Sequence, residues 1–368
     1  MKFSCTQENL SKGITTVARV ASRAGNLPIL SNIHIKAEAE GVFLKATNLE
    51  IGVTCAVRGK IEEIGEITVP AKLFAEYLAF LPKEKVDITL EGTTVEITCG
   101  KHHTKIKGVP AGDFPLIPTI EQGTGAQVSL ADLVEGLNQI LFTVSPSETR
   151  PEISGALIRI EGETCKFAGT DSYRLAEKTI KAQVTGATAQ AIVPLRALQE
   201  LSRICAQEKE EGSVKLLLSQ SQLAVVLPGT EFVSRVIEGQ YPDYRAIVPN
   251  KFKSSVKVSR GEFASALKAA GLFSKAGVYD VGVEIDPSKK IATVSALNAQ
   301  TGEYISSLEA EGEGASAKVA FNWKFLLDGV NALAREKITL QASDSASPAM
   351  LTEEGSSDYF YIVMPIKE

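Results

Sequence analysis

Hydrophobic and polar positions along this chain follow the helix period and the strand period in a fixed order, and that order recurs three times. Each run begins with a short alternating segment that leads into an amphipathic helix pattern, at residues 3–22, 127–145 and 257–274. A strand pattern that leads into a second helix comes later in each run, at residues 69–74, 193–198 and 321–326. The apolar positions of the first two opening helices superpose at one offset, Leu10 on Leu133 and Ile14 on Leu137. Because the spacing is about 125 residues, the size of a domain and not of a solenoid unit, the pattern predicts three copies of one domain.

The segments between the helices predict the strands of each copy. Residues 86–90 and 95–99 alternate on either side of Glu91-Gly92-Thr93-Thr94, which is typical of a hairpin with glycine in its turn. Residues 214–218 with 223–227, and 337–342 before 359–364, repeat that arrangement. Two helices and about seven or eight strands per copy indicate an α+β fold with the helices on one sheet face. We expect domains at residues 1–124, 126–251 and 254–368, joined by short polar links at 124–126 and 250–255.

Composition limits the compartment and the kind of partner. No apolar run approaches the ~20 residues of a membrane span, and residues 1–5 predict a strand and not a signal peptide. The five cysteines are widely spaced and include no Cys-x-x-Cys pair, so we expect neither a zinc site nor a disulfide framework. That cysteine usage favours a reducing cytoplasm. The net charge of −5 argues mildly against binding to nucleic acid.

The distribution of charge changes that expectation. The second helix of each copy carries a cation at an equivalent position, Lys72, Arg196 and Lys324, and a further cation on the same face, Lys83, Arg203 and Arg335. Further basic residues share one face of an opening helix, namely Lys12, Arg19 and Arg23 in the first copy and Lys268 and Lys275 in the third. On a single helix these would be ordinary solvated side chains. Their recurrence in an acidic chain indicates a surface for a polyanion. With no recognition helix, zinc finger or aromatic platform, the contacts would be to phosphates alone and would carry no sequence information.

Eight short motifs distributed over the chain are specific enough to compare with a known family. They are Leu27-Pro28-Ile29-Leu30, Thr47-Asn48-Leu49-Glu50, Val69-Pro70-Ala71-Lys72, Asp113-Phe114-Pro115, Glu148-Thr149-Arg150-Pro151, Thr170-Asp171-Ser172-Tyr173-Arg174-Leu175-Ala176, Tyr241-Pro242-Asp243-Tyr244-Arg245 and Val363-Met364-Pro365-Ile366. With the threefold repeat, they resemble the bacterial sliding clamps, the β subunits of the replicative DNA polymerase. The resemblance covers the whole chain.

The resemblance implies a head-to-tail homodimer in which two chains of three domains form a six-domain ring. Such a ring, lined by helices, would encircle duplex DNA and tether the polymerase as a processivity factor without an active site of its own. An interface that closes on itself is what makes such an assembly a ring and not a filament. The resemblance further implies that polymerase subunits, the clamp loader and repair proteins dock short linear motifs in one pocket.

Two sets of residues carry these expectations. The resemblance places DNA contacts at Lys72, Arg196 and Arg150, with Ser147 beside them, while Arg23 is one place from a family arginine that is Ala24 here. With the helix-face pattern, the expected DNA-binding set is Arg23, Lys72, Ser147, Arg150, Arg196, Arg203 and Lys324. The expected peptide pocket is Ile153, Thr170, Ser172, Tyr173, Arg174, Leu175, Pro242, Ile247, Val363, Met364, Pro365 and Ile366. Two departures from the family pattern, Ala246 and the ending Lys367-Glu368, lie at its rim.

Simpler interpretations of the same residues stay open. Leu175, Val363 and Ile366 suit an ordinary core at a domain join, and Asp171 with Arg174 suits a local ion pair. Pro365 is expected to stop strand pairing and leave the tail free to cover a groove. An interaction scaffold that never binds DNA is the second hypothesis for function.

Enzyme chemistry is the third hypothesis, and little supports it. A hydrolase would have to use the scattered Asp113, Asp171 and Asp243. His34 lies in an alternating strand pattern, and His102 and His103 are expected on opposite strand faces, which is poor geometry for one metal ion. The chain has no Walker A, G-x-G-x-x-G or H-E-x-x-H motif. We therefore expect no catalysis, no metal and no cofactor.

Overall fold

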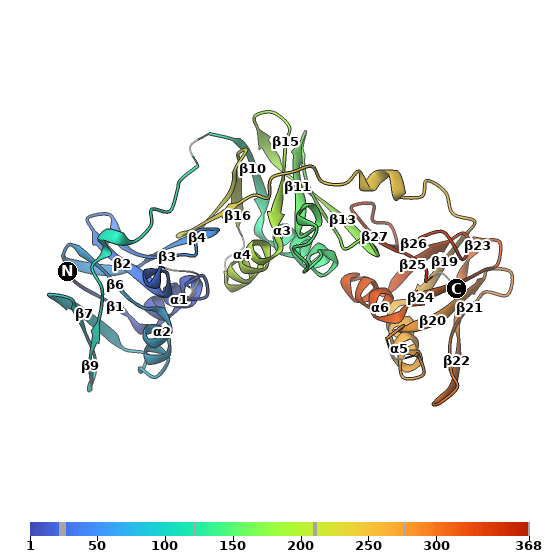
Figure 1. Cartoon of the computed structure of the whole chain (residues 1–368), viewed down its shortest axis with the longest axis horizontal. Helices are drawn as coiled ribbons and strands as arrows, with labels where there is room; N and C mark the ends of the chain where they lie inside the picture. The colour runs from blue at the N-terminus through green and yellow to red at the C-terminus, as the bar shows by residue number, and fades with distance from the viewer. Residues whose placement is uncertain (22–26, 121, 209–211, 276, 367–368) are drawn as a thin grey trace. The chain divides into compact units, whose positions relative to one another are not determined.

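The computed structural model describes residues 1–21, 27–120, 122–208, 212–275 and 277–366 (Figure 1). All six helices that the repeat predicts are present, two in each copy. They are α1 (Gln7–Ala18), α2 (Ala71–Ala79), α3 (Leu130–Ile140), α4 (Leu195–Gln207), α5 (Arg260–Gly271) and α6 (Trp323–Ala332). The α+β prediction is confirmed.

The chain divides into two compact units, and the division does not follow the repeats. Unit 1 comprises residues 1–130, 183–189 and 196–236, and unit 2 comprises residues 131–182, 190–195 and 237–368. Each unit is built around one antiparallel sheet of nine strands. The second copy is split between the units because its strands belong to both sheets.

The large sheet of unit 1 combines strands of the first two copies. In order across the sheet they are β14 (Gln183–Thr185), β10 (Thr124–Ser129), β16 (Ser213–Leu218), β17 (Gln222–Leu227), β18 (Thr230–Arg235), β4 (Ile51–Val57), β3 (Gly41–Thr47), β2 (Asn32–Glu38) and β6 (Gly65–Pro70). The pairing of β18 with β4, from Thr230 opposite Cys55 to Ser234 opposite Ile51, connects the two copies. We call this pairing, with the connecting residues 108–120, the first join.

A smaller sheet completes unit 1. Its order is β5 (Gly59–Glu63), β1 (Lys2–Thr6), β7 (Lys85–Glu91), β8 (Thr94–Cys99) and β9 (His102–Lys107). Helix α1 begins where the Thr6 hydroxyl accepts a hydrogen bond from the Asn9 amide at 3.2 Å. Its apolar face is fully buried, as the periodicity predicts, at Leu10, Ile14 and Val17. Gly13 permits close packing, since a Cβ there would lie 2.7 Å from Val57 Cγ2.

Unit 2 repeats the large sheet with strands of the second and third copies. Its order is β15 (Ala189–Pro194), β11 (Gly155–Glu161), β12 (Thr164–Thr170), β13 (Arg174–Lys181), β27 (Tyr359–Val363), β26 (Ala349–Glu353), β25 (Lys337–Ala342), β19 (Ser254–Ser259) and β23 (Glu311–Gly314). Here β13 pairs with β27, from Arg174 opposite Val363 to Lys178 opposite Tyr359. We call this pairing, with residues 237–253, the second join. It occupies the position in its sheet that the first join occupies in unit 1.

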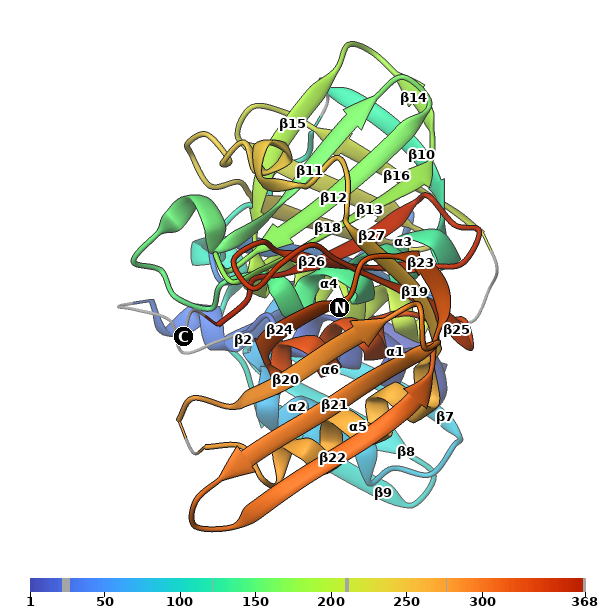
Figure 2. The same ribbon diagram turned by 90° about the vertical axis from the view of Figure 1, so that its right-hand side faces the viewer.

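Polar contacts reinforce the second join from the helix side. The Lys178 amine, on a side chain only 6% exposed, lies 2.8 Å from both Glu135 and Asp358. The Tyr359 hydroxyl donates to the Gln139 carbonyl oxygen at 3.1 Å, which ties β27 to α3. A four-stranded sheet completes the unit, in the order β22 (Gly302–Glu309), β21 (Ile291–Asn298), β20 (Asp280–Asp286) and β24 (Ala317–Asn322). Figure 2 shows its strands β20, β21 and β22 side by side.

Two sequence predictions about connections need correction. Residues 124–126, expected to form a short polar link, lie in β10 and are buried, and the connection between the first two copies comes earlier. At the other expected link, residues 254 and 255 already belong to β19. Strand β26 was not predicted, because only Ala349 and Leu351 are buried in it and so short an alternation gives little signal.

Candidate nucleic-acid surface and peptide pocket

The three equivalent cations occupy the second residue of α2, α4 and α6, and all three are exposed. The Lys72 side chain is 88% exposed, and its amine lies 3.8 Å from Glu76 across one helical turn. The Lys324 amine lies 3.6 Å from the centroid of the Tyr279 ring, a cation–π geometry. A cation in the first turn of a helix opposes the helix dipole, at a cost of about 0.3–1 kcal/mol. A cation at this unfavourable helix position in all three copies indicates a role in function and not in helix stability.

Arg203 has a different environment from these three. Its side chain is only 15% exposed, and its Nε donates to Glu200 at 3.0 Å. Its Nη2 donates to the Thr16 carbonyl oxygen at 2.8 Å, which ties α4 to α1. The geometry favours a structural role for Arg203 over contact with phosphate. Lys12, Lys83 and Arg335 likewise form ion pairs, with Glu208, Glu8 and Glu353.

The remaining expected DNA-binding residues lie in the second copy or outside the described residues. The exposed Arg150 donates to Glu152 at 3.1 Å and to the Ser172 hydroxyl at 2.9 Å. The Ser147 hydroxyl lies 2.9 Å from that of Thr149. The structure thus places Arg150 of the expected DNA-binding set beside Ser172 of the expected pocket. Arg23 lies outside the described residues.

The expected pocket is organised by the turn that leads into β13. The Thr170 hydroxyl donates to the Arg174 carbonyl oxygen at 2.7 Å, and Asp171 Oδ1 accepts from the amides of Tyr173 and Arg174 at 2.9 and 3.0 Å. Ser172 has a φ of 80°, a conformation that such side-chain bonds make accessible. The Met364 amide donates to the Tyr173 carbonyl oxygen at 2.8 Å, so the turn and the end of β27 hold each other in place.

Arg174 connects this turn to α6. Its side chain is 13% exposed and donates to Asp171 at 2.9 Å and to Asp328 at 2.6 Å. Its guanidinium lies 4.5 Å from the centroid of the Phe325 ring, and that ring stacks with Tyr173 at 6.3 Å. The predicted pair of Asp171 with Arg174 is confirmed, and Asp328 extends it into a network that the sequence did not reveal.

The pocket residues divide by burial into a floor and a rim. Ile153, Thr170, Leu175 and Val363 are buried, Arg174, Pro242, Met364, Pro365 and Ile366 are half-buried, and Ser172, Tyr173 and Ile247 are exposed. The interpretation of Leu175 and Val363 as core residues is therefore confirmed, while Tyr173 and Ile247 expose 64% and 52% of their surface. Exposed apolar side chains such as these are suited to contact the apolar anchor of a partner.

Two tyrosines that fix the connecting segment of the second join were missed. Tyr241 and Tyr244 belong to one buried cluster with Leu157, Ala168, Leu175, Ile192 and Ile362. The Tyr241 hydroxyl donates to the Ala168 carbonyl oxygen at 3.3 Å, and the Tyr244 hydroxyl donates to the buried Glu177 carboxylate. Burial raises the pKa of both phenols, so they remain protonated donors. Their spacing in Tyr241-Pro242-Asp243-Tyr244 was the available signal.

The tail departs from its prediction. Pairing in β27 does end at Val363, as Pro365 implies. The tail is not free, however, because the Ile366 amide donates to the Ala320 carbonyl oxygen of β24 at 2.8 Å. Ile366 also lines a cavity of about 500 Å³ with Lys318 and Ser345. Lys367 and Glu368 lie outside the described residues.

The histidines and cysteines have structural environments. His34 in β2 lies 3.0 Å from Glu66 and packs on the Phe114 ring, and burial lowers its pKa. His102 and His103 are consecutive in β9, opposite Cys99 and Thr98. All five cysteines are buried free thiols. Across the described ranges, no three His, Cys, Asp or Glu side chains are placed to share a metal ion, and no helix has the length and apolarity to cross a membrane.

Family models cover almost the whole chain. The models for the N-terminal, central and C-terminal domains of the DNA polymerase III beta subunit match residues 1–118, 127–243 and 245–367. The chain belongs to the DNA polymerase III β subunit family. Members of this family are beta sliding clamps, which are processivity factors of the polymerase and not catalytic enzymes.

Relatives of this family member share its full length. The beta sliding clamp of Synechococcus elongatus is 30% identical, with 100% of this chain and 99% of that protein covered. The Thermotoga maritima β subunit superposes with a TM-score of 0.93 at 26% identity, covering 100% of this chain and 99% of that one. A Pseudomonas aeruginosa sliding clamp, solved bound to griselimycin, superposes with a TM-score of 0.95 at 26% identity and full coverage of both chains.

The contrast between Arg203 and Lys72 yields a stability prediction. Replacing Arg203 with Ala leaves the Glu200 carboxylate unpaired at 15% exposure and should lower the free energy of unfolding by about 2 kcal/mol. Replacing Lys72 with Ala should change it by less than about 0.5 kcal/mol, because that side chain is exposed. Chemical denaturation of both variants measures the difference. Equal destabilisation would contradict the structural role of Arg203.

Proposed function

We propose that two copies of this chain close into a head-to-tail ring around duplex DNA and tether the replicative polymerase in the cytoplasm. The single observation that carries the proposal is the threefold repeat of a clamp domain with an equivalent cation on each second helix. Domain bounds of 1–124, 126–251 and 254–368 are part of the proposal, with the matches at 1–118, 127–243 and 245–367 as support. The function is topological, so it needs a closed path around DNA and no reaction step.

The helix cations suit a ring that moves along DNA. Lys72, Arg196 and Lys324 each lie exposed in the first turn of a helix, where the positive end of the helix dipole also favours a phosphate. Contacts to phosphate alone are independent of sequence and weaken with salt. The protein can therefore slide along DNA without binding more tightly at particular bases. Of the remaining expected residues, Arg150 and Ser147 are exposed and stay part of the proposed surface, and Arg23 and Arg203 stay predictions without support from the described geometry.

Charge reversal tests the DNA surface. The variant Lys72→Glu, Arg196→Glu, Lys324→Glu should shorten retention on nicked circular DNA by at least about tenfold, because phosphate contacts become repulsions. A matched control, Lys60→Glu, Lys181→Glu, Lys215→Glu, changes the charge equally on exposed strand positions and should be retained normally. Gel filtration of the loaded DNA measures retention. Cutting the circle should release the wild type, and equal loss from cut and closed circles would contradict the ring.

The unpaired sheet edges support the dimer. Each join unites four strands of one copy with five of the next, which makes nine. The chain begins with a five-stranded sheet whose edge is β9 and closes with a four-stranded sheet whose edge is β22. Repeat positions make β9 equivalent to β18 and β22 equivalent to β4. The same pairing between β9 of one chain and β22 of another would form a nine-stranded sheet again and remove both open edges.

The helix beside that edge supports the same contact. Leu73 on α2 and Phe80, the residue directly after α2, are 52% and 81% exposed, although both are large apolar residues. Their equivalents on α4, Ala197 and Ile204, are each 1% exposed within unit 1. We propose that the third copy of a partner chain contacts α2, in the way that α1 of the first copy contacts α4 through Thr16 and Arg203.

Carrying the register of the first join to the proposed interface places Lys105 opposite Glu303, where the first join has Val233 opposite Gly52. Lys105→Glu and Glu303→Lys should each weaken the dimer by about tenfold, since a like-charge pair costing about 0.7 kcal/mol occurs at both interfaces of the ring. The double variant restores opposite charges and should recover the dimer. Sedimentation equilibrium measures the dissociation constants, and a double variant as weak as the singles would contradict this register.

We propose further that partner proteins, among them polymerase subunits, the clamp loader and repair proteins, dock short linear motifs on the pocket of unit 2. The exposed apolar side chains of Tyr173 and Ile247 support this. We propose that griselimycin, which is bound to a relative, takes the same pocket in this chain. The Arg174 network would keep the rim rigid, so little ordering entropy is lost on binding.

Griselimycin offers a defined probe of the pocket. Deleting residues 365–368 removes the Ile366 contact to β24 and one wall, and should weaken griselimycin binding by on the order of thirtyfold. Ile64→Ala, a control at an apolar residue 70% exposed elsewhere, should bind normally. Calorimetry measures both affinities, with sedimentation to check that the dimer persists. Unchanged binding by the truncated protein would place the docking site elsewhere.

A further inference from the structure

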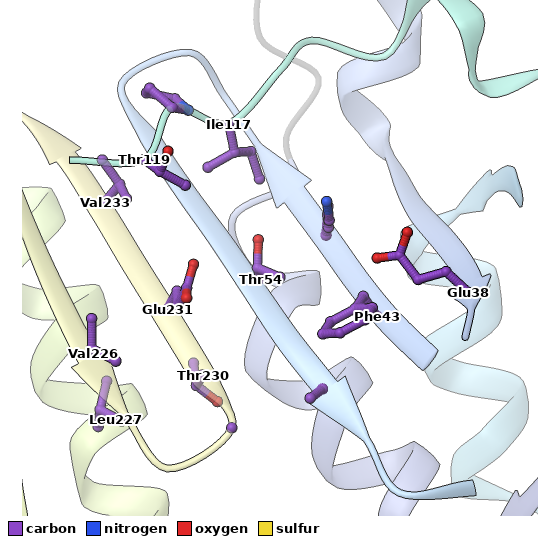
Figure 3. Close-up of a pocket in the computed structure, with 14 residues that line it drawn as sticks. Glu38, Phe43, Thr54, Ile117, Thr119, Val226, Leu227, Thr230, Glu231 and Val233 are labelled. Carbon is purple, nitrogen blue, oxygen red and sulfur yellow. The ribbon is translucent and has the colours of Figure 1, made fainter. Parts of the chain in front are cut away.

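The first join carries a groove on the face of its sheet opposite α1. One part, of about 380 Å³, lies among Phe43, Lys45, Thr54 and Glu231. The other part, of about 350 Å³, lies among Leu49, Gly52, Leu116 and Arg235. Pro118 and Val233 line both parts. Figure 3 shows Ile117 and Thr119 of the connecting segment beside Thr54, Glu231 and Val233.

The second part of this groove repeats the architecture of the pocket at the second join. Thr47 occupies the position of Thr170, and its hydroxyl donates to the Ile51 carbonyl oxygen at 2.8 Å. Leu49 occupies the position of Ser172 and has the same left-handed backbone, with a φ of 75°. The Arg235 amide donates to the Glu50 carbonyl oxygen at 2.9 Å, as Met364 does to Tyr173. The two sites therefore share one backbone framework.

The connecting segment supplies an apolar surface in the first groove. Gly52 stands where the second join has Leu175, and a Cβ at Gly52 would lie 2.6 Å from Ile117 Cγ2. Ile117 therefore takes the space of the missing side chain. Beside it, Leu116 is 96% exposed and Leu49 is 48% exposed. A leucine held at positive φ is strained, and here the strain presents an apolar side chain at the rim of a groove.

The charges of the first groove differ from those of the second. Glu50 and Arg235 replace Tyr173 and Met364, and Lys45 and Glu231 replace Ala168 and Phe360. Among the described residues, none of Lys45, Glu50, Glu231 or Arg235 forms a side-chain ion pair, and all four are exposed or half-buried. Because β4, β3 and β18 are interior strands, no backbone edge is open to a peptide there. Recognition at this groove must use side chains.

We propose that the first join is a second docking groove, for a short extended segment of a partner protein that carries an aliphatic side chain next to a carboxylate. The aliphatic group packs on Leu49, Leu116 and Ile117, and the carboxylate pairs with Arg235, whose planar guanidinium matches a carboxylate with two hydrogen bonds. Glu38, Glu50 and Glu231 line the same groove, so it repels the many phosphates of DNA, whereas a segment with one carboxylate needs only the single contact with Arg235. The proposal rests on the proposed function in that its partner is a protein recruited to the clamp.

Methyl NMR on the full-length dimer tests this with two synthetic peptides, acetyl-Gly-Ser-Leu-Asp-Ser-Gly-amide and the same peptide with Lys in place of Asp. The Asp peptide should shift the methyl signals of Leu49 and Leu116 with millimolar affinity, at least about fivefold tighter than the Lys peptide. Arg235→Glu should reverse that preference, and Leu116→Ser should remove the binding. Met364→Ala, in the second pocket, should leave it unchanged.

Three outcomes overturn the proposal: no shift of Leu49 or Leu116 at 5 mM Asp peptide, shifts confined to the pocket of unit 2, or larger shifts of Leu116 with a duplex DNA oligonucleotide. Griselimycin binding by Arg235→Glu and Leu116→Ser should equal that of the wild type. If all forms fail to bind griselimycin while the peptide shifts persist, the proposed pocket of unit 2 is wrong and the first-join groove stands.

Discussion

Backbone pairing between neighbouring copies is the constraint on which this structure depends. At each join a strand of one copy continues the sheet of the next, β4 with β18 and β13 with β27. Every residue of such a ladder must find a partner for its amide and carbonyl groups, so the pairing fixes register and spacing together. The turn at Thr170, the Arg174 network and the tail at Met364 all take their positions from the ladder at the second join.

The two joins share a framework and differ in what they place on it. At the second join Tyr241 and Tyr244 bury their rings on Ala168 and leave an apolar rim exposed. At the first join Phe114 packs on His34, and Ile117 fills the space above Gly52. One backbone solution thus supports two surfaces of different chemistry, because the residues that face away from the helices are not needed for the sheet itself.

Much of the fold followed from the sequence because it depends on local periodicity. The spacing of apolar residues within each segment predicts helices α1 to α6 and the hairpin of β7 with β8. The pairing of β18 with β4 does not, since it joins residues far apart in the chain and adds no local signal. For the same reason the link at 124–126 was misplaced, because Thr124 and Gly125 gain their burial from a partner strand.

The site shows the same limit at single residues. Lys72 and Arg203 have the same charge and lie on similar helix faces, yet one is solvated and the other is held by Glu200 and Thr16. Only the partner from another helix distinguishes them. Arg174 was expected in the pocket and is there, but Asp328, which fixes it, lies 154 residues away.

The second copy gives strands to both nine-stranded sheets, and this has a consequence for how the chain folds. A repeat is usually regarded as a unit that can form alone, but here the second repeat is divided between two compact units, each with its own nine-stranded sheet. An isolated second repeat would end in two open strand edges, β18 and β13, both with partners missing. Such a fragment would be prone to aggregation. The second repeat can be recognised in the sequence by itself, but it needs strands of both neighbouring repeats to complete its sheets.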